Sequence, residues 1–172
     1  MVVKFRRVLN LAIIIALVFL ILFGFHFFYK SAGKGFDNGP EGVFKFSKKA
    51  QIKTEKTQFD CEILRTLEGI TDITVFSPET IKGLKFSWLG DHQEISLGGA
   101  LVSKSSQDIL PINSPPCAIC KVLNHASKLG SKSKNIKSTV DTFDYLIELD
   151  ENSGEINNIK IPSLALTANF TD

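Results

Sequence analysis

The only CxxC pair in this sequence is Cys117-Ala118-Ile119-Cys120. It falls in the first turn of a predicted helix, where the helix dipole lowers the pKa of a thiol and favours a reactive dithiol. A thioredoxin-like enzyme carries its CxxC in a βαβ context, whereas here no Trp precedes the pair and no strand leads directly into it. We therefore expect no redox catalysis. Two alternatives stay open, a local disulfide between Cys117 and Cys120 or buried thiols without a chemical role.

The other reactive residues are too scattered to indicate an enzyme or a metal site. No serine occurs in a nucleophile-elbow pattern, and the adjacent acids Asp150 and Glu151 fall in a predicted turn, where acids commonly bond to the local backbone. Only one closely spaced pair occurs among the potential zinc ligands, which are Cys61, Cys117, Cys120 and His125. We expect no enzymatic activity, no metal and no cofactor.

The basic residues concentrate at the N-terminus. The 172 residues include 20 Lys and Arg against 18 Asp and Glu, a formal net charge of +2. The first 30 residues contain no acid but hold Lys4, Arg6, Arg7 and Lys30, so the remainder of the chain is slightly acidic. A nucleic-acid-binding domain normally presents a strongly basic surface. Nucleic acid is therefore excluded as a partner.

An uncharged segment, Val8 to Tyr29, follows the basic residues 1–7. A helix of that length spans the roughly 30 Å hydrocarbon core of a bilayer, and its aromatic end is typical of a membrane interface. Lys4, Arg6 and Arg7 stay in the cytoplasm by the positive-inside rule. We predict a single-pass anchor over residues 8–29 in the cytoplasmic membrane, with the C-terminal domain outside the cytoplasm. Cleavage near Ser31-Ala32-Gly33 is the alternative.

The rest of the chain is expected to contain a tether and one domain. The segment 30–41 is rich in glycine, a composition that favours a flexible tether. The domain then covers residues 42–172. Within it, apolar residues alternate along short segments such as Phe59-Cys61-Ile63 and Leu84-Phe86-Trp88, which is the period of half-buried strands. Because the intervening residues are polar, an antiparallel sheet with one face in water is predicted.

One helix is predicted after the first strands. Pro115 suits the first helical position behind Ser114 as N-cap, and Gly130 suits the C-cap. Apolar side chains recur at helical spacing, at Ile119, Val122, Leu123, Ala126 and Leu129. A polar loop, Ser131 to Ser138, and later strands between Tyr145 and Phe170 complete the pattern. The fold class is therefore α+β, with an antiparallel sheet that lays its apolar face on this helix.

Two segments carry a family resemblance. The first runs from Leu67 through Ser77-Pro78-Glu79 to Trp88, and the second is Leu149-Asp150-Glu151-Asn152-Ser153-Gly154 followed by Ile159-Lys160-Ile161-Pro162. Over residues 42–172 the chain thereby resembles small exported bacterial lipoproteins with the LolA-like lipoprotein-carrier fold. That resemblance implies a curved antiparallel sheet, a half-barrel packed on one or few helices, whose concave apolar face receives acyl chains or another hydrophobic ligand. It also implies binding and not catalysis.

The in-facing strand residues are the predicted lining of such a ligand site, namely Phe44, Phe46, Phe59, Ile63, Val75, Phe86 and Trp88. The same residues would be ordinary core in a domain without a ligand cavity. The first functional prediction is a membrane-tethered extracytoplasmic domain that holds a lipid, another apolar ligand or a lipoprotein-like partner. The alternative is an extracytoplasmic sensor or assembly subunit that acts through contact with an envelope protein, with the apolar face as plain core.

Overall fold

The computed structural model describes residues 45–106, 109–129 and 135–171. The chain divides into two compact units, Met1–Asp37 and Asn38–Asp172, and the fold described below belongs to the second. The predicted anchor Val8–Tyr29, the tether 30–41 and the predicted ligand residue Phe44 lie outside the described residues. Within the described ranges, no helix combines the length and the apolar character that crossing a bilayer requires.

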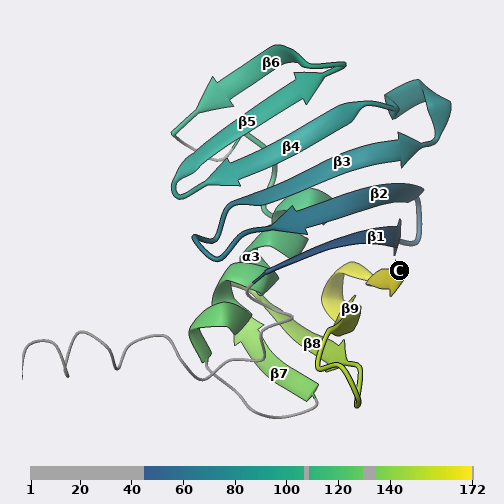
Figure 1. The fold of residues 1–172 in the computed structure, drawn as a ribbon, viewed down its shortest axis with the longest axis vertical. Helices are drawn as coiled ribbons and strands as arrows, with labels where there is room; N and C mark the ends of the chain where they lie inside the picture. Colours follow the sequence, from purple (N-terminus) through teal and green to yellow (C-terminus); the bar gives the residue numbers. More distant parts are fainter. Residues whose placement is uncertain (1–44, 107–108, 130–134, 172) are drawn as a thin grey trace, which may run out of the picture. The chain divides into compact units, whose positions relative to one another are not determined.

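Ten strands form one antiparallel sheet in the order β6-β5-β4-β3-β2-β1-β10-β9-β8-β7 (Figure 1). The sheet is curved and does not close on itself, because β6 and β7 lie at its two edges. The strands are β1 (Phe46–Lys53), β2 (Gln58–Arg65), β3 (Thr71–Ser77), β4 (Leu84–Leu89), β5 (His92–Leu97), β6 (Ala100–Ser105), β7 (Asn135–Val140), β8 (Phe143–Leu149), β9 (Ile156–Ile161) and β10 (Leu166–Thr171). The α+β class with a curved antiparallel sheet is confirmed.

The helix α3 (Pro115–Leu129) lies against one face of the sheet (Figure 1). The strands turn every second side chain toward it, and register places equivalent residues side by side, as with Ile63 opposite Ile73 and Ile73 opposite Phe86. These inward side chains and the apolar stripe of α3 form one buried cluster. Ile119 and Leu123 of the predicted stripe are fully buried in it, which is the arrangement that a 3.6-residue period requires.

Three local expectations for the second half of the chain differ from the structure. The predicted polar loop at Ser131–Ser138 includes the start of β7, an edge strand in which only Ile136 is buried. The predicted stripe residue Leu129 is 45% exposed, since α3 ends there. Ser114 precedes α3 as predicted, but its Oγ is buried and bonds to none of the described residues. Pro116, at the second helical position, has no N–H, so only the third position could donate to a capping side chain.

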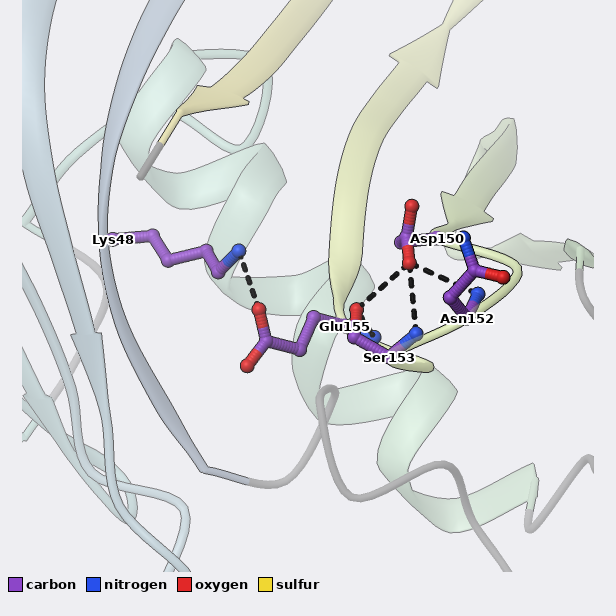
Figure 2. Close-up of polar contacts among 5 residues, drawn as sticks. All are labelled: Lys48, Asp150, Asn152, Ser153 and Glu155. Carbon is purple, nitrogen blue, oxygen red and sulfur yellow. Dashed lines mark hydrogen bonds and ion pairs between the residues drawn. The ribbon is translucent and has the colours of Figure 1, made fainter.

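The predicted turn at Glu151–Gly154 connects β8 to β9, and its polar contacts are drawn in Figure 2. One carboxylate oxygen of Asp150 accepts hydrogen bonds from the backbone N–H groups of Asn152 and Ser153, at 3.0 and 2.8 Å, and from the Ser153 hydroxyl at 3.0 Å. Just after this turn Glu155 pairs with Lys48 of β1, with Nζ and Oε2 2.6 Å apart. The turn is thus held by its own aspartate. The ion pair links the residue just before β9 to β1, the strand on the other side of β10.

Candidate apolar ligand pocket

A pocket of about 450 Å³, open at the surface, lies between the inner face of the sheet and the start of α3. Its size is within the range of about 300–1,000 Å³ that small-molecule sites occupy. Most of its walls are apolar, and the polar groups come from the turn and strand start at residues 56–58. The lining residues are Lys56, Thr57, Gln58, Phe59, Val75, Pro78, Ile81, Phe86, Pro115 and Pro116.

Strand alternation explains the floor of the pocket. Phe59 of β2, Val75 of β3 and Phe86 of β4 occupy the inward phase of their strands and are at most 9% exposed. Their rings and methyl groups lie at the edge of the buried cluster and form its surface toward the pocket. The floor therefore continues directly into the core.

Two proline-containing segments form the walls. Beyond β3, Pro78 and Ile81 of the short 3₁₀ turn η1 (Glu79–Ile81) lie at the pocket. On the other side, Pro115 and Pro116 begin α3. The first N–H groups of a helix have no partner within the helix, but prolines have no N–H to leave unsatisfied. The helix start therefore faces the pocket with apolar rings in place of polar donors.

The structure separates the predicted lining residues into two groups. Phe59, Val75 and Phe86 line the pocket, whereas Ile63 is completely buried in the core. Trp88 is also in the core, with its ring centroid 6.4 Å from that of Phe86. Phe46 packs edge-on against Phe170 at a centroid distance of 5.6 Å. Sequence alternation missed Pro78, Ile81, Pro115 and Pro116, because these residues lie in a turn and a helix start.

A second hollow, also of about 450 Å³, lies at the other end of β1 and β2 and is lined by residues 45–47 and 64–68. Arg65 lies at its base and is only 3% exposed. One Arg65 Nη donates to Thr71 Oγ1 at 2.7 Å and to Asn124 Oδ1 at 2.8 Å, and the other donates to Ser127 Oγ at 3.2 Å. Burial lowers the pKa of the guanidinium. Arg65 therefore fastens the C-terminal half of α3 to the sheet, and this hollow is less suited to an apolar ligand.

The three cysteines are buried in the core, and Cys117 and Cys120 are thiols that form no disulfide with each other. Burial raises the pKa of Cys120 to about 12 and that of Cys61 likewise to about 12. Such environments oppose the thiolate that a redox dithiol or a zinc ligand needs. Among the described residues, no group of three or more His, Cys, Asp and Glu side chains could hold a metal ion. His125 instead lies 2.9 Å from the hydroxyl of Tyr145 through its Nδ1.

No family model matches this sequence. No curated protein matches it either. Among solved structures, the chain is similar to the crystal structure of a LolA superfamily protein from Nitrosomonas europaea. The match covers 77% of this chain and 89% of that chain, with a TM-score of 0.33 and 7% sequence identity.

Proposed function

We propose that this chain is a membrane-tethered binding protein whose C-terminal domain, outside the cytoplasm, holds the hydrocarbon chain of a lipid or a similar apolar ligand. The apolar pocket carries the proposal. Two aromatic rings, Val75 and the proline-rich walls offer a surface that gains free energy when it is covered by a hydrocarbon chain, at about 25 cal/mol per Å² of apolar area removed from water. The polar residues Lys56, Thr57 and Gln58 lie where a ligand's polar end would remain in water.

The anchor and orientation are part of the same proposal. The uncharged segment Val8–Tyr29 and the preceding Lys4, Arg6 and Arg7 support a single-pass helix with the N-terminus in the cytoplasm. A domain tethered in this way works at the membrane surface and does not shuttle between membranes. It acts by binding, without catalysis.

Equilibrium dialysis of radiolabelled palmitate against residues 38–172 tests the pocket. We expect saturable binding of one palmitate per chain. Ile81→Trp places a large ring at the pocket wall on a short turn, so it should fill the pocket and weaken binding at least about tenfold, equivalent to about 1.4 kcal/mol. Leu67→Trp is the matched control, because it puts the same ring in the second hollow. Absence of saturable binding, or equal weakening by both variants, would refute the pocket as the ligand site.

Contact with an envelope protein is the second candidate function. It is favoured by exposed apolar side chains on the β5–β6 hairpin, including Leu101 and Val102. Under this alternative, palmitate should not bind and the residues of the apolar pocket should act only as core.

A further inference from the structure

Four exposed apolar side chains gather at one end of the sheet. Ile81, Leu97, Leu101 and Val102 are 36, 49, 61 and 64% exposed, and together we call them the apolar rim. The two loops that carry them are joined, because the Gly98 N–H donates to the Gly83 carbonyl oxygen at 3.1 Å. The register of β4 with β5 places Leu97 beside Leu84. Leu97 lies on the α3 side of the sheet, whereas Leu101, which pairs with Ser96, lies on the other side, so the rim surrounds the tip formed by the β3–β4 turn and the β5–β6 hairpin.

The part of the apolar rim on the α3 side of the sheet is continuous with the pocket. Ile81 belongs to both, since its side chain is exposed and also lines the pocket wall. Phe86 of the pocket floor pairs in register with Ile95, two residues before Leu97 of the rim. Leu97 is therefore linked to the pocket floor through Ile95 and Phe86, and Ile81 lines the pocket itself.

The charges around the rim suit a phospholipid surface. Glu79 and Lys82, which flank Ile81, neutralise each other in an ion pair of 3.1 Å. The neighbouring β1–β2 connection adds Lys53, Glu55 and Lys56, an excess of one positive charge. Lysines at the border of an apolar patch keep their ammonium groups at the level of lipid phosphates while the apolar side chains enter below them.

The exposed apolar residues of β6 are not explained by pairing of this edge strand with a strand from another protein. The pairing of β6 with β5 shifts register between Ile95 and Ser96, so Val102 lies in a bulge. Lys104 on the same edge forms an ion pair with Glu94. Bulges and edge lysines are the devices by which sheets resist the pairing of another strand. The apolar rim is therefore exposed at an edge that is otherwise protected.

We propose that the apolar rim docks on the outer surface of the bilayer, so that a lipid chain passes from the membrane directly into the pocket. This inference rests on the proposed function, to which it adds the route of the ligand. The chain length permits it. Residues 30–44, fully extended, span at most about 50 Å. The eight residues of β1, which separate Lys45 from the rim end of the sheet, cover only about 26 Å.

Depth-dependent quenching in the full-length protein tests the docking. The chain is reconstituted in phosphatidylcholine nanodiscs that contain doxyl-labelled lipid, with an environment-sensitive fluorophore on Leu101→Cys. The native cysteines are at most 1% exposed and should not take the label. Leu67→Cys is the matched control, since it is 70% exposed in the turn between β2 and β3, at the opposite end of the sheet. We expect doxyl lipid to remove about half or more of the emission at residue 101, as for a group about 5–10 Å into the interface, and to leave residue 67 unchanged.

Equal quenching at both positions, or none at either, would overturn the inference. So would a fluorophore at residue 101 that is unaffected by doxyl lipid and shifts only when envelope extract is added, because that result assigns the rim to a protein partner. A second variant separates the inference from the proposed function. Leu101→Ser with Val102→Ser should retain palmitate binding in dialysis but lose most of the transfer of lipid from vesicles. Failure of the proposed function would instead appear as absent palmitate binding in the unmodified protein.

Discussion

Arg65 offers a sharp test of how the helix is held on the sheet. Its guanidinium is almost completely buried and donates at least three hydrogen bonds, to Thr71, Asn124 and Ser127. Hydrogen bonds that involve a charged group contribute about 1.5–3 kcal/mol each, but the burial that lowers the Arg65 pKa shows an opposing desolvation cost. The hydroxyl groups of Thr71 and Ser127 can rotate to other partners. Most of the lost stability should therefore come from Asn124 Oδ1, which would be left without its donor.

We therefore expect Arg65→Met to lower the free energy of unfolding by about 2 kcal/mol, near the cost of one unmet acceptor plus part of a second. Arg65→Ala should lose about 1–2 kcal/mol more, because it also removes the packed stem and leaves a cavity. At about 4 °C per kcal/mol for a domain of this size, the melting temperatures should fall by about 8 and 14 °C.

Urea unfolding of residues 38–172, followed by the single tryptophan, measures both variants. Trp88 is well placed as the probe, since it pairs in register with Thr71, the partner of Arg65. Leu64→Ala, at an exposed neighbouring position, is the control and should change stability little. If Arg65→Met were as stable as the unmodified chain, desolvation would cancel the hydrogen bonds, and Arg65 would not be what fastens α3 to the sheet.

Three further predictions concern acid sensitivity, the thiols and topology. Hydrogen bonds from the backbone of Ser153 and Asn152, and then from the Ser153 hydroxyl, lower the pKa of Asp150 in the folded chain. The stability that Asp150 contributes is therefore fully present above its unfolded pKa of about 3.9. It is lost as pH falls through the lower pKa of the folded state. Asp150→Asn should reduce the acid dependence of the melting temperature, and an unchanged profile would contradict the assignment. Because burial raises the pKa of Cys61 and Cys120 to about 12, iodoacetamide at about pH 8 should label the chain only in denaturant, and rapid native labelling would reveal an accessible thiolate. For topology, a membrane-impermeant maleimide should label Asp91→Cys in intact cells, and labelling only after lysis would reverse the proposed orientation.

The sequence pattern was most successful for elements that have one apolar face and one polar face. Clear alternation identified β2 and β4, and the 3.6-residue stripe identified α3, because each buries one side and exposes the other. The edge strands β6 and β7 were missed for a physical reason. β7 buries one side chain fully, and the bulge at Val102 breaks the alternation of β6.

The pocket could be predicted only in part. Its floor follows strand alternation, but its walls depend on where a turn and a helix start meet in space, which sequence spacing does not encode. Arg65 had a usable signal, since it continues the alternation of Phe59, Cys61 and Ile63 at the inward position. A charged residue in that phase indicates a buried polar contact, whereas its partners on α3 become visible only in the structure.

The strand order has a consequence for how the domain assembles. Every pairing in the sheet joins strands that are neighbours in the chain, except that β1 pairs with β10, with Lys49 opposite Thr171. The length-dependent part of the entropic cost of closing that loop is about 4 kcal/mol. The two sets of sequentially paired strands, β1–β6 and β7–β10, should therefore form early, and the pairing of β1 with β10 should form late. If the domain crosses the membrane behind the proposed anchor, starting from the residues next to it, β10 is the last strand to emerge. Until then β1 and β9 lack the strand that joins them, so a chain truncated within β10 should fail to reach the compact state and should be degraded.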